Sequence, residues 1–556
     1  MRTFSSLTFL AALVLEDAIA SPAQVPFTAE LSKPRKLHGR FLHITDMHPD
    51  PYYTPKTSQS TACHRKKPKK KKQESLYYGT PYSECDSPFQ LTNFTLDYLH
   101  DKWADEIDFV IWTGDNARHD NDRHVPRTPS EIYMLNREVA KKMRKHFSSK
   151  GIPVVPSLGN NDVWPHNILT PGPNSITNEF AQIWTSFIPF PYLQVFQRGA
   201  YYTVEVIPDE VAVISLNTMY FYDSNKVVSG CAFIEPNDPG NLQIDWVEVQ
   251  LEMYRNRGMQ VWMTGHVPPS ADNYFPECYV RYVELSLRYQ DTILGHLFGH
   301  MNVDHFFFLE AADLNIFPNL DSKTELKTES QSGFYKSILE EFSGLPKSPK
   351  MTDYAVVNVA PAVVPNPYVP AFRIFSYNIT GGISNQEKPQ IKKRKHGEHR
   401  TDRNHTASCE SPEYRDTWQC HLDRPWNSDP SSPARTNQKW SPLGYAQYWM
   451  PKLGKADKKT PPQFELEYMT YPLELLHPAV AGPEASASGF VYPVPLPLLP
   501  ESLRTPGVEK SKYAPYQMRD LTIPSWIRLG QRIADEKRRK LRKRFRKYMF
   551  LGGDEE

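Results

Sequence analysis

The sequence predicts an α/β protein with a largely buried sheet. From Arg40 to about Tyr377, short apolar runs of strand length alternate with amphipathic stretches of helical length. The strand-like runs are apolar on both faces, as the segment 108–114 (Asp-Phe-Val-Ile-Trp-Thr-Gly) illustrates. Strands of this kind are typical of sheets that are covered by helices. A chain of 556 residues is long enough to bury the core that such a sheet requires.

The predicted elements follow one another within residues 36–384, which we expect to form one domain. Strands are predicted at 41–45, 109–113, 154–158, 211–216, 261–264, 305–309 and 354–359. Helices are predicted at 89–106, 129–147, 242–257 and 278–290.

The two ends of the chain differ from this domain. Residues 1–20 are predicted to be a signal peptide or signal anchor, because Arg2 precedes an apolar run and Ala18 and Ala20 form a cleavage pattern. The apolar run is shorter than the ~20 residues of a spanning helix, and residues 21–35 are predicted to be a linker. Residues 385–556 are charged or proline-rich and contain a predicted basic helix around 526–550. We expect this extension to wrap the domain or to remain largely irregular.

Cysteines and glycosylation sequons agree with a secretory route. The six cysteines form three pairs of sequence neighbours, although six cysteines permit fifteen pairings. An oxidising compartment would allow three local disulfides. The neighbouring pairs are Cys63–Cys85, Cys231–Cys278 and Cys409–Cys420. Sequons for N-glycosylation occur at Asn93, Asn378 and Asn404.

Five apolar runs end in a cluster of glycine, aspartate, histidine or asparagine. These clusters contain Asp46 and His48, Asp115, Asn160, His266 and His300. The spacing of Asp46 and His48 would place both side chains on one face of an extended strand, as is needed to hold one ion. Since ligand sites of open α/β sheets lie outside the carboxyl ends of the strands, we expect the five clusters to meet there.

Donors of this kind predict a metal centre. Carboxylate, amide and imidazole ligands suit hard or borderline divalent ions. Six or more donors exceed the three protein ligands that a single catalytic zinc usually keeps. A carboxylate shared by two ions ~3.5–4 Å apart can stabilise both oxygens of an in-line displacement and hold a hydroxide nucleophile. The pattern therefore predicts a hydrolase with two divalent metal ions, drawn from Mn, Mg, Zn, Co or Fe.

The clusters resemble the motifs of the calcineurin-like metallophosphoesterases. The matching segments are Asp46-Met47-His48, Gly114-Asp115, Gly159-Asn160, Gly265-His266 and Gly299-His300. The resemblance covers roughly residues 40–380. Residues 113–120 resemble the acid sphingomyelinase-like branch, whereas residues 159–162 and 299–306 and a basic insert are similar to the fungal vacuolar endopolyphosphatases. The resemblance implies a four-layer αββα sandwich and hydrolysis of internal phosphoanhydride bonds in inorganic polyphosphate. It also implies a place in the vacuole lumen or at the lumen-facing vacuole membrane.

The same resemblance assigns roles to individual residues. Asp46 and His48 would hold the first metal, Asp115 would bridge, and Asn160, His266 and His300 would hold the second. His119 would contact the substrate phosphate or protonate the leaving oxygen.

Two positions depart from the family pattern. Asn161 stands where a histidine usually serves as acid or phosphate contact, and an amide cannot usefully donate a proton. Asn302 replaces a second metal-binding histidine, and its oxygen could still bind a harder ion such as Mg²⁺ or Mn²⁺.

The basic insert between Cys63 and Cys85 is the candidate substrate-binding segment. It contains Arg65, Lys66, Lys67, Lys69, Lys70, Lys71 and Lys72. The insert is either a solvated loop, a surface that captures a long polyanion, or a processing site for basic-residue proteases. The C-terminal basic helix could likewise bind polyphosphate or an anionic membrane surface, or remain solvated.

Other functions share parts of this pattern. An acid sphingomyelinase-like phosphodiesterase would use the same metals, but no cysteine-rich saposin-like segment precedes the core. A purple acid phosphatase would have tyrosine where Arg118 stands, and a nuclease would require a stacking platform that is not evident. We therefore expect no specific nucleic-acid partner. A catalytically silent polyanion-binding module is the last alternative. The complete set of metal donors argues against it, because such a module would not need them.

Overall fold

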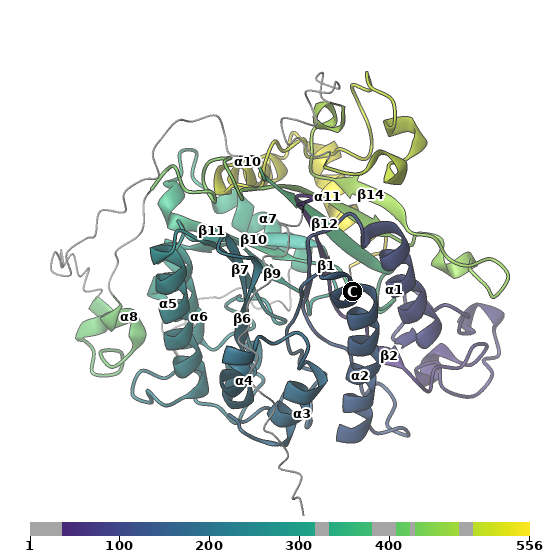
Figure 1. Ribbon diagram of the computed structural model, residues 1–556, viewed down its shortest axis with the longest axis horizontal. Coiled ribbons are helices and arrows are strands. Elements are labelled where there is room, and N and C mark those ends of the chain that lie inside the picture. Colours follow the sequence, from purple (N-terminus) through teal and green to yellow (C-terminus); the bar gives the residue numbers. More distant parts are fainter. Residues whose placement is uncertain (1–35, 317–332, 381–406, 423–428, 478–492, 556) are drawn as a thin grey trace, which may run out of the picture. The chain divides into compact units, whose positions relative to one another are not determined.

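A computed structural model describes residues 36–316, 333–380, 407–422, 429–477 and 493–555 (Figure 1). The predicted signal segment and linker, the sequon at Asn404 and the basic run at 392–400 lie outside these residues. From His38 onward the described residues form one unit.

Two six-stranded sheets form the centre of the described chain. The first sheet has the order β14 (Glu465–Met469), β13 (Pro442–Trp449), β12 (Ala371–Tyr377), β1 (Arg40–Ile44), β4 (Phe109–Trp112) and β5 (Val154–Pro156). The second has the order β10 (His305–Glu310), β11 (Tyr354–Val359), β9 (Ile293–Phe298), β8 (Gln260–Thr264), β7 (Val211–Ser215) and β6 (Tyr202–Ile207). A short pair, β2 (Pro49–Asp50) and β3 (Ser87–Pro88), closes the base of the disulfide loop.

The strands that carry the predicted clusters are parallel within each sheet. In the first sheet β1, β4 and β5 are parallel, and in the second β7, β8, β9 and β11 are parallel. Their carboxyl ends therefore lie along a common edge of each sheet. The inner faces meet through aromatic side chains such as Phe41 and Trp262, whose ring centroids are 5.2 Å apart.

Helices flank both sheets, which gives the expected αββα layering. On one side lie α1 (Phe89–Trp103) and α2 (Pro129–His146), and on the other α5 (Pro239–Asn256) and α6 (Pro276–Arg288) (Figure 1). The remaining helices are α3 (Ser175–Ile183), α4 (Leu193–Gly199), α7 (Phe334–Gly344), α8 (Trp418–His421), α10 (Ile523–Ala534) and α11 (Arg539–Met549). None of the helices in the described part of the chain is long and apolar enough to cross a membrane.

Local sequence explains where α2 begins and ends. Thr128 caps its first turn by accepting a hydrogen bond from the Glu131 backbone N–H, and Pro129 fits the first helical position. Basic residues occupy its last turn, where the helix dipole favours positive charge. The predicted strands and helices between residues 36 and 384 are confirmed to within three residues at each end.

The C-terminal region packs on the domain, which is one of the two expected arrangements, and it adds two strands that the sequence analysis did not predict. β13 pairs with β12, and β14 pairs with β13, so both complete the first sheet. The basic helix expected around 526–550 is two helices, α10 and α11, which are separated at Asp535–Arg538. A boundary at residue 384 therefore does not divide two folding units. The proline-rich composition concealed both strands: β13 pairs with the distant β12, and β14 pairs with β13, its neighbour in the sequence.

Candidate metal centre and active site

Asp46 and His48 lie in a tight turn directly after β1. Both have left-handed backbones, with φ values of 51° and 38°, which non-glycine residues rarely adopt. The turn is held because the backbone N–H groups of Asp46 and Met47 donate to the carbonyl oxygens of Gly114 and Asp115. Strand alternation, which the sequence suggested, is therefore not what brings the two side chains together. Backbone strain of this kind is often found at functional sites.

Asp115 lies at the centre of the cluster and is only 1% exposed. Its Oδ2 atom is 3.4 Å from Nε2 of His48 and 3.2 Å from Nε2 of His266. Its Oδ1 accepts the Asn161 backbone N–H at 2.8 Å. A Cβ atom at Gly159 would collide with this carboxylate, so the close approach requires glycine there.

Asn160, His266 and His300 form the other side of the cluster. Oδ1 of Asn160 is 2.9 Å from Nε2 of His266 and 3.0 Å from Nδ1 of His300. The structure thus brings together the residues that the five sequence motifs predicted. Asp46, Asp115 and His266 each offer a ligand atom within 4.8 Å of the others.

The histidine rings are oriented for metal binding. Nδ1 of His48 bonds to the Ala117 carbonyl and Nδ1 of His266 to the Thr113 carbonyl, each at 2.7 Å. Protein metal ligands are commonly fixed in this way, with the second nitrogen left for the ion. Nε2 of His48 is buried and has no hydrogen-bond partner among the described residues. A divalent cation would satisfy that nitrogen, so the donor set fits a metal.

The electrostatics of the cluster also favour a cation. Burial alone would lower the pKa of His48 and His266, but Asp46 and Asp115 outweigh it and raise both pKa values to about 9. Burial and the neighbouring His266 lower the pKa of His300 to about 4. In the metal-free chain, protons on His48 and His266 thus balance the two carboxylates.

His119 lies beside the cluster and stacks on His48, with ring centroids 3.9 Å apart. Its Nδ1 is 2.7 Å from Oδ1 of Asp86, whose other oxygen accepts the His119 backbone N–H at 2.6 Å. Burial opposes ionisation of Asp86, but His119 and His48 lower its pKa. Sequence reasoning missed Asp86, because its partner lies 33 residues away and no motif joins them.

Asn161 contacts the central carboxylate of the cluster. Its Nδ2 donates to Oδ2 of Asp115 at 2.8 Å, and the residue is 2% exposed. Arg127, which the sequence did not single out, is also buried and donates through Nη1 to the carbonyl oxygens of Asn161 and Arg118. Asp162, another missed residue, accepts backbone N–H groups from Asp115, Asn116, Ala117 and Gly159. These contacts fix the loops that carry the donors.

Asn302 is close to the cluster in sequence and has an unsatisfied oxygen. Its Nδ2 donates to the Asn366 carbonyl at 3.0 Å, whereas its buried Oδ1 has no hydrogen-bond partner in the part of the chain that the structure describes. Metal binding by this oxygen stays a prediction.

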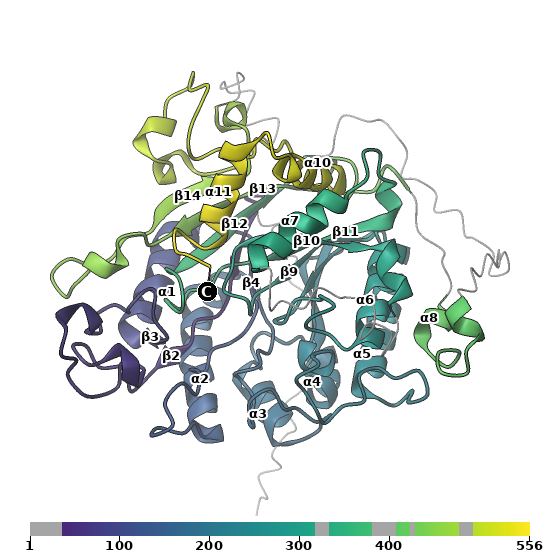
Figure 2. The same cartoon turned by 180° about the vertical axis from the view of Figure 1, so that it is seen from behind.

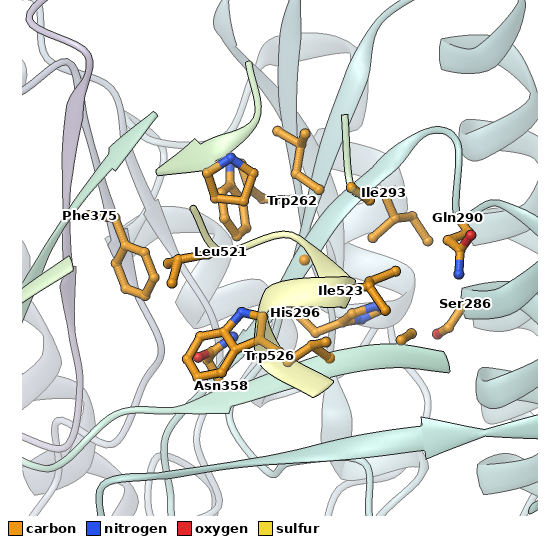
Figure 3. Close-up of a pocket in the computed structure, with 16 residues that line it drawn as sticks. Trp262, Ser286, Gln290, Ile293, His296, Asn358, Phe375, Leu521, Ile523 and Trp526 are labelled. Carbon is orange, nitrogen blue, oxygen red and sulfur yellow. The ribbon is translucent and has the colours of Figure 1, made fainter. Parts of the chain in front are cut away.

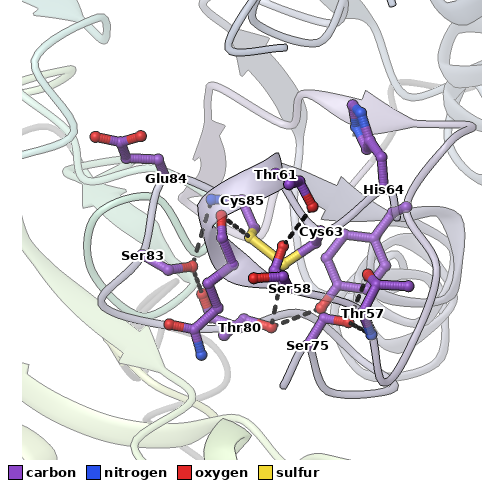
Figure 4. Close-up of a disulfide and its surroundings, with 12 residues drawn as sticks. Thr57, Ser58, Thr61, Cys63, His64, Ser75, Thr80, Ser83, Glu84 and Cys85 are labelled. Carbon is purple, nitrogen blue, oxygen red and sulfur yellow. Dashed lines mark hydrogen bonds between the residues drawn. A yellow bond between two sulfur atoms is a disulfide. The ribbon is translucent and has the colours of Figure 1, made fainter. Parts of the chain in front are cut away.

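The basic insert lies in the loop closed by the Cys63–Cys85 disulfide (Figure 4). The side chains of Lys66, Lys67 and residues 69–72 are exposed. Arg65 is different, because it forms an ion pair with Asp122 in the loop that carries His119. His64 binds the same Asp122 at 2.8 Å and Asp50 at 2.7 Å. The insert is therefore attached to the active-site loop.

The other disulfides and sequons are also placed. The structure contains Cys231–Cys278 and Cys409–Cys420, so every cysteine of the chain is paired. Asn93 lies on α1 and Asn378 follows β12, and both are partly exposed. Glycosylation at these positions stays a prediction.

A small cavity of about 20 Å³ lies between the sheets (Figure 3). It is lined by Trp262 and His296 of the second sheet, Phe375 of the first, and Ile523 and Trp526 of α10. None of the predicted metal or substrate residues lines it, and its volume is about that of one or two water molecules.

Comparison with known proteins agrees with this geometry. Residues 39–303 match the family model of the calcineurin-like phosphoesterases. An endopolyphosphatase of Cryptococcus neoformans is 40% identical over 94% of this chain and 95% of its own length. One from Schizosaccharomyces pombe is 32% identical over 90% of this chain and 84% of its own length. One from Saccharomyces cerevisiae is 47% identical over 49% of this chain and 42% of its own length.

Proposed function

We propose that this chain, which belongs to the endopolyphosphatase family and carries its calcineurin-like phosphoesterase domain, hydrolyses internal phosphoanhydride bonds of long-chain inorganic polyphosphate. The observation that carries the proposal is the position of Asp115 between two sets of donors. Asp46 and His48 lie on one side, and His266 with Asn160 on the other.

Two divalent ions fit this arrangement better than one. Asp46 and His48 would hold the first ion, and Asn160, His266 and His300 the second, with Asp115 shared between them. Two such ions, when bound, stabilise the attacking and leaving oxygens of an in-line phosphoryl displacement. Asn302 would add an oxygen ligand, and unchanged metal content in Asn302→Ala would refute that addition.

His119 is the candidate for binding or protonating the substrate. Asp86 holds Nδ1, which leaves Nε2 as the nitrogen that can exchange a proton. Phosphate leaves an anhydride more readily than an alkoxide leaves an ester, so little protonation is needed. His119→Ala should therefore impair alkyl ester turnover more than anhydride turnover, and equal losses would contradict that role. Asn161 would orient Asp115 rather than act as an acid.

The exposed lysines of the insert are the candidate capture surface for the polyanion. Clustered cations release counterions when a polyanion binds, which gives strong and salt-dependent association. Arg65 would instead anchor the insert through Asp122.

We also propose that the chain acts in an oxidising compartment of the secretory route, such as the vacuole lumen. The pairing of all its cysteines supports this location.

The test of function is product analysis on long-chain polyphosphate. Metal-loaded wild-type protein should produce chains of intermediate length, and Asp115→Asn should produce none. Asp105→Asn, which alters an exposed carboxylate, is the matched control. If polyphosphate survives while sphingomyelin or another diester is cleaved, the assignment of polyphosphate as substrate is wrong and that of the metal centre still holds.

A further inference from the structure

The helix α11 carries a cationic surface that the catalytic cluster does not use. Seven of its eleven residues are basic, and none is acidic. The basic residues are Arg539, Lys540, Arg542, Lys543, Arg544, Arg546 and Lys547. Among the residues that the structure describes, none of the seven forms an ion pair with a carboxylate. Such a concentration of like charge repels itself and favours binding of a polyanion.

The apolar side of α11 is already covered. Phe545, Tyr548 and Met549 are buried, and Tyr548 stacks on Tyr468 of β14 with ring centroids 4.5 Å apart. Phe545 lies against Phe306 of β10. Helices that insert into membrane interfaces bury an apolar face among the lipids, and α11 has none to offer. Its charge therefore favours a soluble polyanion over a membrane.

The carboxyl end of α11 adjoins the metal-binding loop. The carbonyl of Met549 accepts the backbone N–H of Asp304 at 3.0 Å, only two residues after Asn302. Beyond the helix, Gly553 lies against Tyr368 and against Tyr82 of the disulfide loop. In Figure 2, and likewise in Figure 1, the C-terminus lies between α11 and the loop that contains β2.

Two cationic surfaces thus belong to segments that contact loops of the cluster. The insert is attached to the loop of His119, beside the first-metal residues. The helix α11 adjoins the loop of His300 and Asn302, on the second-metal side. A polyphosphate chain held on both surfaces would present an internal bond, not a terminal one, to the metals.

We infer that α11 is a second docking surface for the polyphosphate chain and that it favours cleavage at internal bonds. This inference rests on the proposed function. The helix is about 16 Å long, so an extended chain would place several phosphates along it.

The test is a variant in which four basic residues of α11 are replaced by neutral glutamine: Arg539→Gln/Lys540→Gln/Lys543→Gln/Arg544→Gln. Its KM for long-chain polyphosphate should rise about tenfold, and the slope of log affinity against log salt should fall by about three. Its kcat on long chains and its kcat/KM on triphosphate should stay at wild-type values, because short chains do not reach α11. Products from long chains should shift toward shorter lengths.

Two further variants make the result interpretable. Lys102→Gln/Lys141→Gln/Arg144→Gln/Lys145→Gln removes the same charge from exposed or nearly exposed positions of α1 and α2, and should leave KM unchanged. Arg539→Lys/Arg544→Lys keeps the charge and should keep the wild-type KM.

The experiment distinguishes a failure of the α11 inference from a failure of the proposed function. If wild-type protein does not cleave polyphosphate, the proposed function fails. If it does, an unchanged KM and salt slope in the α11 variant overturn the inference alone. An equal loss on triphosphate would indicate general damage and also overturn it. Loss of binding to phosphatidylserine–phosphatidylcholine vesicles with an unchanged polyphosphate KM would assign α11 to a membrane instead.

Discussion

Two buried carboxylates, Asp115 and Asp304, have opposite surroundings. Asp115 is 1% exposed and lies beside His48 and His266. Asp304 is 4% exposed and forms an ion pair with Arg373. Gln447 also donates to Asp304 at 2.9 Å, and Tyr468 at 2.6 Å.

The kind of cation that balances each carboxylate distinguishes a ligand-binding site from a structural ion pair. A guanidinium keeps its charge at every ordinary pH, so Arg373 is a lasting cationic partner for Asp304, although burial raises the pKa of that carboxyl. The protons on His48 and His266 can be exchanged for a metal ion, because a histidine must be neutral to bind one. A buried charge that is balanced only by titratable groups is therefore prepared for a ligand. One that is balanced by arginine holds the fold.

The largest expected effect is the loss of activity in Asp115→Asn. The amide cannot bridge two cations as a carboxylate does, and metal polarisation contributes several kcal/mol to such reactions. The activity should fall on the order of 1000-fold. The unfolding free energy of the metal-free variant should stay close to that of wild type in urea titrations. A large loss of stability with retained activity would place Asp115 among the structural residues.

Asp304→Asn should have the reverse effect. Removing one partner of a buried ion pair leaves Arg373 uncompensated and costs about 3–5 kcal/mol. Urea unfolding should show this loss, while kcat at saturating metal should change little in the folded fraction. The control is Asp245→Asn, which breaks the pair with Arg281 at a 58% exposed carboxylate. It should cost less than about 1 kcal/mol. Equal costs would remove the distinction between the pairs.

The two carboxylates also differ in how far sequence reveals them. Asp115 closes an apolar run and follows a glycine, so local pattern alone identified it. The partners of Asp304 lie 69, 143 and 164 residues away, and no periodicity connects them. A distant partner, β12, likewise explains why β13 was missed in a proline-rich segment, and β14 was missed with it because it pairs only with β13. Asp86 and Arg127 were missed because no apolar run ends beside them, and Asp162 was missed because it binds backbone N–H groups in the same loop as Asn160.

Metal binding by the cluster around Asp115 should depend on pH. Since the pKa values of His48 and His266 are raised to about 9, protons compete with the ion below that pH. Affinity should therefore rise with pH up to about 9, by as much as about a hundredfold per unit where both protons are displaced. Isothermal titration in buffers of different ionisation enthalpy would count the released protons. An affinity that is constant between pH 6 and 8 would contradict proton exchange.

A third carboxylate, Glu341 on α7, tests whether a carboxylate that has no balancing cation is kept protonated instead. It accepts the backbone N–H of Phe308 at 2.8 Å, and no arginine within the described ranges forms an ion pair with it. Burial, together with Glu310 and Asp313, raises the pKa of Glu341 to about 8. The folded protein thus holds a proton that the unfolded chain releases above its ordinary pKa of about 4.3.

The stability that depends on this proton is full below pH 4.3 and is lost as the pH rises through 8. We expect a loss on the order of 2 kcal/mol across that window, because partial exposure of Glu341 reduces the full effect. Glu341→Gln resembles the protonated form and should flatten the fall in unfolding free energy between pH 5 and 8. Glu138→Gln, at an exposed position of α2, should leave the profile unchanged. If Glu341→Gln also leaves it unchanged, Glu341 is ionised in the folded protein. A largely buried carboxylate would then need neither a metal nor an arginine.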